Sequence, residues 1–170
     1  MNNKNKTKRR DFLFTATYTI GAVGLASAIW PLVDQMNPDS SVKAASTTEV
    51  DVSSVKAGKS ITVLWRGKPI FIKRRTTKEI DEAKNVDLKD LKDPQKDSDR
   101  AKNPEWLVMV GVCTHLGCVP LGDKGDYKGW FCPCHGSHYD SSGRIRKGPA
   151  PKNLEIPKYE FVNNNTIKIG

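Results

Sequence analysis

The pattern of apolar and polar residues divides the chain into one long uncharged run and a series of short alternating segments. Residues 12–33 form a run of 22 residues without a charged side chain. A helix of that length extends about 33 Å at 1.5 Å per residue, enough to cross the hydrocarbon core of a bilayer, which is about 30 Å thick. The pattern therefore predicts one N-terminal transmembrane helix.

A cleavable signal peptide is the alternative interpretation of this run, since Ala26-Ser27-Ala28 resembles a cleavage site. The apolar core of a signal peptide is usually only about 7–15 residues long, so an uncleaved anchor is favoured. Basic residues precede the run, Arg9-Arg10 is typical of a twin-arginine export signal, and Asp34 follows. The positive-inside rule then predicts that residues 1–11 stay in the cytoplasm and that the rest is exported.

The composition changes twice after the apolar run. Residues 34–46 are rich in Ser, Ala, Asp and Asn without apolar periodicity, which predicts a flexible linker. Residues 47–170 then form the exported domain.

Within this domain, residues 76–103 are dense in lysine and aspartate, and we expect a solvated helix-and-loop insertion. Mixed charge signs without interleaved aromatic residues argue against nucleic-acid binding.

The remaining apolar residues lie in short runs that are typical of strands. Arg66-Gly67-Lys68 and Asn163-Asn164-Asn165 each separate two such runs, as a hairpin turn would. The predicted strands cover residues 48–52, 60–65, 69–73, 106–112, 129–131, 159–162 and 166–169. The exported domain is therefore expected to be all-β and antiparallel.

Overall composition limits the membrane part and the meaning of the charge. Hydrophobic residues make up 37% of the chain, so most of its length lies in water. The formal net charge is +9, but five positive charges precede the apolar run, where they set topology. The basic balance therefore does not describe the exported surface.

All four cysteines and two of the three histidines lie in two short segments. These are Cys113-Thr114-His115-Leu116-Gly117-Cys118 and Cys132-Pro133-Cys134-His135-Gly136-Ser137. Each segment pairs one cysteine with one histidine at C-x-H or C-x-x-H spacing, close enough to lie in one tight loop. Two predicted strands lead directly into these segments, so the loops belong at strand ends. The pattern indicates a metal site with two cysteines and two histidines.

Three kinds of site remain open for such a residue set. Structural zinc sites often use two cysteines and two histidines, but they separate the cysteine pair from the histidine pair. Four cysteines in an exported domain also suit two disulfides, although histidines then have no purpose. Rieske [2Fe-2S] centres, in which histidines replace cysteines on one iron, fit the mixed segments best.

The two segments resemble the cluster-binding loops of Rieske proteins from quinol-cytochrome c oxidoreductases. The resemblance extends to the twin-arginine start, the single apolar run, Lys92-Asp93-Pro94-Gln95, Pro104-Glu105-Trp106 and Gly148-Pro149-Ala150-Pro151. It covers most of the chain and points to the mitochondrial and alphaproteobacterial branch. It implies an antiparallel Rieske-type β-sandwich with a cluster-binding subdomain at about 106–151, preceded by one N-terminal transmembrane helix.

The resemblance also implies one [2Fe-2S] cluster per subunit and a role for each residue of the loops. One iron would be buried and the other would lie near the surface. The ligands would be Cys113 and Cys132 on the buried iron and His115 and His135 on the outer iron, with a disulfide between Cys118 and Cys134.

Neighbouring residues are expected to tune and shield this cluster. The hydroxyls of Ser137 and Tyr139 would donate hydrogen bonds to a bridging sulfide and to a ligand sulfur, which raises the potential. Leu116 would form an apolar tip beside the histidines, and residues 148–151 would cover the cluster. The resemblance gives His138 no ligand role.

The function that the resemblance implies is electron transfer from ubiquinol to a c-type cytochrome. We expect His135 to contact the quinol, with His115 nearby, and a ring nitrogen to accept a proton as the cluster accepts an electron. The expected partners are cytochrome b and a membrane-bound c-type cytochrome, in a dimeric complex of the inner membrane, with residues 34–46 as a hinge. A Rieske ferredoxin and the small subunit of a periplasmic molybdenum oxidase are the alternatives. The anchor and the two cysteines expected in the disulfide disfavour a ferredoxin. Residues 104–106 disfavour the molybdenum oxidase subunit.

Overall fold

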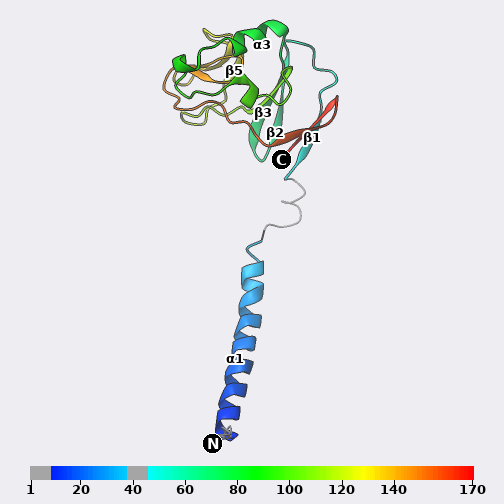
Figure 1. The fold of residues 1–170 in the computed structure, drawn as a ribbon, viewed down its shortest axis with the longest axis vertical. Coiled ribbons are helices and arrows are strands. Elements are labelled where there is room, and N and C mark those ends of the chain that lie inside the picture. The colour runs from blue at the N-terminus through cyan, green and yellow to red at the C-terminus, as the bar shows by residue number, and fades with distance from the viewer. Residues whose placement is uncertain (1–8, 38–45) are drawn as a thin grey trace, which may run out of the picture. The chain divides into compact units, whose positions relative to one another are not determined.

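The computed structural model describes residues 9–37 and 46–170, and the chain divides into two units, Met1–Ala44 and Ala45–Gly170. The basic tail of residues 1–8 and most of the predicted linker, residues 38–45, lie outside the described residues. We call the second unit the head. Each unit is described by itself (Figure 1).

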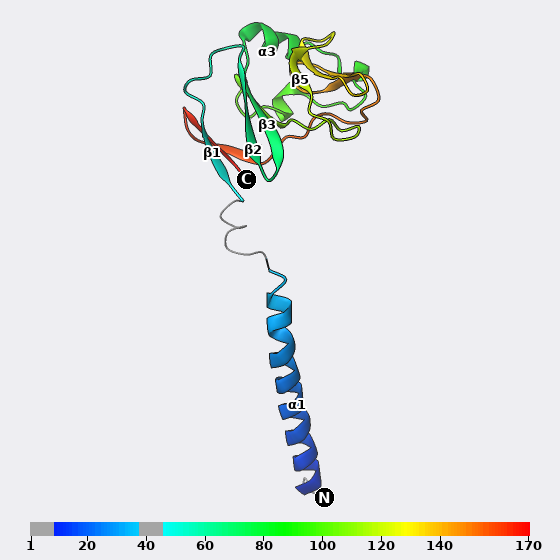
Figure 2. The ribbon, with the colours of Figure 1, turned by 180° about the vertical axis from the view of Figure 1, so that it is seen from behind.

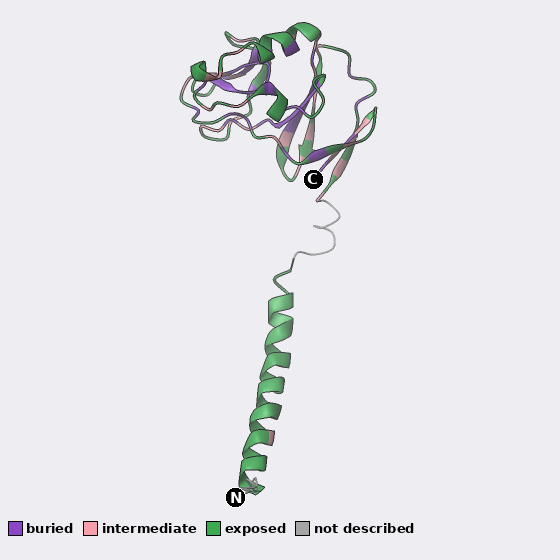
Figure 3. Cartoon of the chain, in the orientation of Figure 1, coloured by how far each residue is buried: buried purple, intermediate pink, exposed green. Residues whose placement is uncertain are grey.

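The first unit contains helix α1, Arg9–Asp34, which confirms the predicted long apolar helix. None of its residues is buried (Figure 3). The hydroxyls of Thr15, Thr19 and Ser27 each donate to a backbone carbonyl four residues earlier. Polar side chains satisfied within the helix suit an apolar surrounding. By length and composition α1 can cross a membrane, a test that a signal sequence also passes.

The described part of the head contains three antiparallel sheets. Their orders are β1-β10-β9, β2-β3-β4 and β5-β6-β7-β8. The strands are β1 Thr48–Asp51, β2 Ser60–Trp65, β3 Lys68–Arg74, β4 Trp106–Val110, β5 Leu121–Lys124, β6 Gly129–Cys132, β7 Ser137–Tyr139, β8 Ile145–Lys147, β9 Tyr159–Asn163 and β10 Thr166–Ile169. The predicted antiparallel β architecture is confirmed.

The middle sheet is covered on both faces, because alternate residues of a strand point to opposite sides. Ile70 and Ile72 of β3 join one core with residues of β1, β9 and β10, while Phe71 joins a second core. Strand β4 alternates in the same way, with Val108 in the first core and Met109 in the second. The second core also contains side chains of the third sheet, which it therefore fixes to the middle sheet.

Both ends of the head can be followed in Figures 1 and 2. Helix α3, Thr77–Lys84, and strand β5 lie at one end, and β1 and the C-terminus lie at the other. The β2–β3 hairpin turns at Arg66 and Gly67, which both have positive φ (50° and 73°), as a two-residue turn with right-handed twist requires. Strand β3 therefore starts one residue earlier than predicted.

The charged insertion is only partly as expected. It contains α3, which begins with a capping box between Thr76 and Glu79, and two short 3-10 turns, Leu88–Asp90 and Asp97–Asp99. The expectation of a solvated segment is wrong at Asp97 and Arg100, which are buried. These charges have hydrogen-bond partners both inside and outside the insertion.

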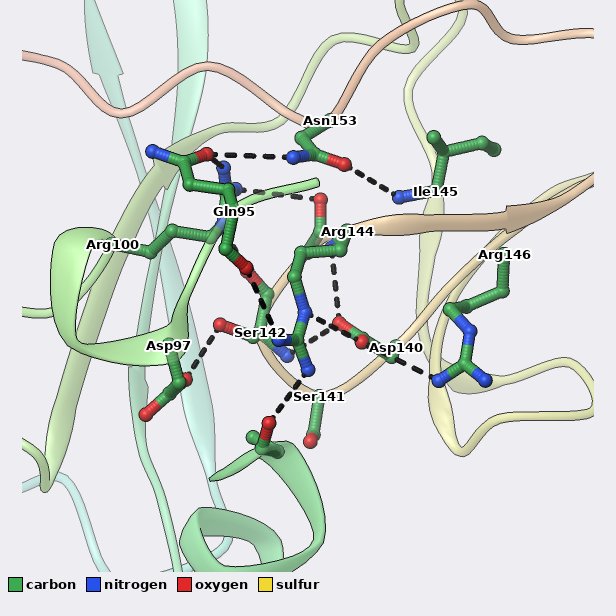
Figure 4. A network of polar contacts seen from close by, with 12 residues as sticks. Gln95, Asp97, Arg100, Asp140, Ser141, Ser142, Arg144, Ile145, Arg146 and Asn153 are labelled. Atoms are coloured by element: carbon green, nitrogen blue, oxygen red, sulfur yellow. Dashed lines mark hydrogen bonds and ion pairs between the residues drawn. The ribbon is translucent and has the colours of Figure 1, made fainter. Parts of the chain in front are cut away.

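Figure 4 shows the buried Asp97 and Arg100 with some of their partners, among them Ser142 and Gln95. The carboxylate of Asp97 accepts bonds from Arg75 Nη1 and Ser142 Oγ, both at 2.6 Å. Arg100 donates from Nε to the Ser142 carbonyl at 2.6 Å and from Nη2 to the Leu154 carbonyl at 2.7 Å. Buried charges are tolerated only with such pairing, so the insertion is a structural part of the head.

Candidate metal centre

The two cysteine and histidine segments form two loops, one between β4 and β5 and one between β6 and β7. The second loop is the turn of the β6–β7 hairpin, in which Cys132 pairs with Ser137. The Gly136 amide donates to the Cys132 carbonyl at 3.0 Å, and Gly136 has a φ of 72°. Such a turn needs a residue that adopts positive φ without strain, which explains the glycine.

The first loop follows β4 and is closed in a similar way. The Gly117 amide donates to the Cys113 carbonyl at 2.9 Å, and the Cys113 amide donates to the Cys118 carbonyl at 2.7 Å. Gly117 has a φ of 85°. A disulfide joins Cys118 to Cys134 of the second loop, as the resemblance implied. The two loops are therefore held together covalently.

The other two cysteines remain free thiols, and both are buried. Burial alone would raise the pKa of Cys113. Hydrogen bonds to its sulfur, the strongest of them from the Tyr139 hydroxyl, outweigh burial and hold this pKa below its usual value. Burial and a hydrogen bond to Cys113 raise the pKa of Cys132. The Cys132 sulfur also lies within 4.8 Å of the two disulfide sulfurs, but those are already bonded to each other and are poor ligands.

The two loop histidines lie side by side and closer to solvent than the thiols. The ring centroids of His115 and His135 are 4.7 Å apart, in an edge-to-face arrangement. Nδ1 of His115 is buried without a hydrogen-bond partner, the one such side-chain nitrogen or oxygen in the described part of the chain. An unpaired buried nitrogen is costly, and a metal ion is the partner that an imidazole nitrogen beside free thiols fits.

The structure brings the predicted ligands together as two pairs, the rings of His115 and His135 and the thiols of Cys113 and Cys132. The orphaned His115 nitrogen, the exposed His135 ring and the buried thiols of Cys113 and Cys132 form a donor set of two nitrogens and two sulfurs. This donor set fits a two-iron group that is held by sulfur on the inside and by imidazole on the outside.

Two buried hydroxyls flank the thiols, as the resemblance implied. The Tyr139 hydroxyl lies 3.2 Å from the Cys113 sulfur and accepts from the Thr114 amide at 3.3 Å. Burial first, and the hydrogen bond to Cys113 second, raise the pKa of Tyr139 above its usual range, so the group stays protonated. The Ser137 hydroxyl oxygen accepts from the Ala150 amide at 3.2 Å, which leaves the hydroxyl proton for another acceptor.

A third loop, residues 148–151, packs closely against the second one. A side chain at Gly148 would come within 2.3 Å of the Gly136 carbonyl oxygen, and Gly148 has a φ of 99°. Thr114 Oγ1 donates to the Lys152 carbonyl at 2.6 Å, which ties the first loop to the end of the third. The predicted position of residues 148–151 beside the candidate centre is what the structure has.

Leu116 is exposed as predicted, and two further apolar side chains that follow it in the sequence are exposed as well. Leu116 is 70% exposed, and Val119 and Leu121 are each 51% exposed. Sequence reasoning missed the latter two, although both closely follow the disulfide cysteine of the first loop. His138 lies apart from the donor set, with Nδ1 accepting from the Asp126 amide at 3.1 Å.

The comparisons with known proteins agree with this geometry. The family model described as "Rieske [2Fe-2S] domain" matches residues 43–160, and that described as "Ubiquitinol-cytochrome C reductase Fe-S subunit TAT signal" matches residues 1–39. The chain is 58% identical to the ubiquinol-cytochrome c reductase iron-sulfur subunit of Rhodospirillum rubrum, over 97% of this chain and 93% of the relative. It is 54% identical to that of Rickettsia prowazekii, over 99% and 97%.

A solved structure is similar as well. A chain of a structure titled "Hyperthermophilic respiratory Complex III" superposes with a TM-score of 0.56 at 31% identity, covering 90% of this chain and 97% of the other. The similarity therefore includes nearly the full length of both chains, and not only the loops.

Proposed function

Because the chain belongs to the family of iron-sulfur subunits of ubiquinol-cytochrome c reductase, with a Rieske [2Fe-2S] domain, we propose that Cys113, Cys132, His115 and His135 bind its cluster and that His135 meets the quinol. The buried, unpartnered Nδ1 of His115 beside two free thiols is the observation that carries this proposal. The matched relatives are named for this reductase, and not for a ferredoxin or a molybdenum oxidase.

The ligand assignment follows from burial and from the two nitrogens of imidazole. The thiols of Cys113 and Cys132 lie inside and are suited to the inner iron. His115 presents Nδ1 to the interior, so the nitrogen on the other side of its ring is left to face outward. We expect the same orientation for His135, which is the more exposed of the two rings.

The proposed chemistry takes one electron and one proton from ubiquinol. A bound [2Fe-2S] group supplies one-electron redox chemistry at a potential that its hydrogen bonds and ligands set. The outward ring nitrogen of His135 accepts a hydrogen bond from the quinol hydroxyl and then holds the proton. The exposed Leu116 excludes water from that contact when the tip docks on an apolar partner surface.

The partners and location follow from the same premise. As part of a complex III assembly, the chain would take an electron from quinol held by another subunit and pass that electron on. We propose cytochrome b as the first partner and a membrane-bound c-type cytochrome as the second, in a dimeric complex. Residues 34–46 would serve as the hinge that lets the head move between cytochrome b and the c-type cytochrome.

We further propose that α1 is an uncleaved single-pass anchor in the inner membrane. The match of residues 1–39 to an export signal and the apolar character of α1 support this. The basic residues before α1 then place the N-terminus in the cytoplasm and the head in the periplasm. An oxidising compartment also suits the disulfide between Cys118 and Cys134.

The ligand assignment is tested by comparing two histidine variants of the full chain. His135→Ala should abolish the two-iron EPR signal and lower the bound iron, because an outer ligand is lost. His138→Ala is the matched control, three residues away and outside the donor set, and should keep both. A His135→Ala protein with the normal signal and iron content would refute the assignment.

A further inference from the structure

The loop of residues 148–151 is held at both ends by the charged insertion. Lys92 Nζ donates to the Gly148 carbonyl at 2.6 Å. At the other end, the Asp93 carboxylate accepts from the Asn153 amide at 2.9 Å, and the Asp93 carbonyl accepts from Asn153 Nδ2 at 2.9 Å. Two neighbouring residues of the insertion therefore bridge the two ends of one loop, more than 50 residues further along the chain.

Asn153 also bonds to residues outside the two ends of the loop, and Figure 4 shows its contacts with Gln95 and Ile145. It is 6% exposed, and its Oδ1 accepts from the Ile145 amide at 3.0 Å. Its Nδ2 also approaches Gln95 Oε1 at 3.4 Å, the oxygen that accepts from Arg100 at 2.7 Å. Both the donor and the acceptor side of this buried amide are used. A change in any partner would leave a buried polar group unpaired, so the geometry is strongly preferred.

The middle of the same loop lies on a hydroxyl of the candidate centre. The Ala150 amide donates to Ser137 Oγ, and both residues are buried. Because this bond occupies one lone pair of the oxygen, it restricts the directions in which the hydroxyl proton can point. The position of the loop therefore decides where Ser137 can donate.

We propose that Lys92, Asp93 and Asn153, which we call the loop clamp, are positioning residues that fix the Ser137 hydroxyl through the Ala150 amide and so help to set the cluster potential. The inference rests on the proposed function, because the Ser137 hydroxyl can tune a redox potential only if a cluster lies beside it. The insertion then contributes to the redox chemistry without contacting the cluster.

The chain offers a matched control for the clamp, since Leu88-Lys89-Asp90 is followed directly by Leu91-Lys92-Asp93. In the described part of the chain, the side chains of Lys89 and Asp90 form no hydrogen bond or ion pair, and both residues are exposed. The test pair is Lys92→Met with Asp93→Ala, and the control pair is Lys89→Met with Asp90→Ala. Both pairs remove the same charges.

Two measurements on the full chain with its cluster test the clamp. The first is the midpoint potential by EPR, which the test pair should lower and the control pair should leave unchanged. The second is hydrogen–deuterium exchange of the peptide that contains Ala150. Loss of about 1.4 kcal/mol of local stability would speed this exchange about tenfold in the test pair. Should the test pair fold poorly, Lys92→Met alone, at an exposed site, is measured in the same way.

A background of Ser137→Ala separates positioning from general loosening. In this background the test pair should cause no further fall in potential, because the hydroxyl that it positions is gone. In the chain that retains Ser137, Asp93→Asn keeps a side-chain acceptor oxygen, so its midpoint potential should stay close to that of the unaltered chain. A fall of equal size with and without Ser137 would overturn the clamp, and so would an unchanged potential in the test pair.

The failure of the clamp can be told from the failure of the proposed function. If Ser137→Ala lowers the potential and the test pair does not, only the clamp is wrong. If Ser137→Ala itself leaves the potential unchanged, the tuning role of the hydroxyl is wrong, and the clamp is overturned with it.

Discussion

Tyr139→Phe is the substitution that most directly tests how the protein tunes the candidate centre. It removes one oxygen and keeps the buried ring. That oxygen lies 3.2 Å from the Cys113 sulfur and 3.3 Å from the Thr114 amide. We expect the cluster to assemble with a lower midpoint potential, because the hydroxyl favours the more negative, reduced state over the oxidised one.

The size of the effect can be worked from the hydrogen bond. Bonds to charged groups contribute about 1.5–3 kcal/mol, and part of this is common to both redox states. A difference of about 1–2 kcal/mol between the states corresponds to roughly 40–90 mV, since a one-electron couple shifts by about 59 mV per factor of ten. The Thr114 amide loses an acceptor in both states, which costs stability but does not change the potential.

The assay is an EPR redox titration of the full chain at one pH, with Tyr127→Phe as control. Tyr127→Phe is the same chemical change at the turn between β5 and β6. There the guanidinium of Arg146 lies over the Tyr127 ring. The control should leave the potential unchanged. A Tyr139→Phe protein whose potential matches the unaltered chain would refute the hydrogen-bond argument.

Two further predictions concern stability, both measured by chemical unfolding of the full chain in detergent. Replacing Cys118 and Cys134 together by Ser should lower the free energy of unfolding by about 3 kcal/mol, because the disulfide closes a loop of 16 residues. The cluster should also be lost more easily. A variant as stable as the unaltered chain would contradict this prediction. Burial alone would raise the pKa of Asp97, but bonds from Arg75 and Ser142 hold it below its usual value. The stability that this carboxylate contributes is therefore present above about pH 4 and lost as the pH falls through its lowered pKa. Asp97→Asn should lower the free energy of unfolding by about 3–5 kcal/mol at pH 7. It should also make the remaining stability fall less steeply in acid. An unchanged dependence of stability on acid pH would contradict the pairing of Asp97 with Arg75.

The sequence predicts the strands that carry the cores because their apolar residues are dense enough to be recognised. Strand β4 is buried along its whole length, and β2 and β3 form a clear hairpin. Strands β5, β7 and β8 were not predicted. They have three or four residues each, and β5, Leu121–Lys124, is exposed throughout with a glycine in it. Their pairing depends on the third sheet as a whole, which no local pattern reveals.

The candidate ligands could be picked out for a different reason, since cysteine and histidine are rare and lie close together in sequence. The residues around them were not. Asp93 and Asn153 are 60 positions apart, and charged residues in a polar segment are normally solvated. Only the folded structure shows that Asp97 and Arg100 are buried.

The proposed function requires that this chain bind a two-iron centre with exposed imidazole ligands, and that the centre take up an electron and a proton together. The most direct measurement is the midpoint potential of the full chain in its membranes, titrated by EPR from neutral to alkaline pH. We expect a centre that ascorbate reduces and whose potential falls as the pH rises. A low potential that does not change with pH would contradict this expectation.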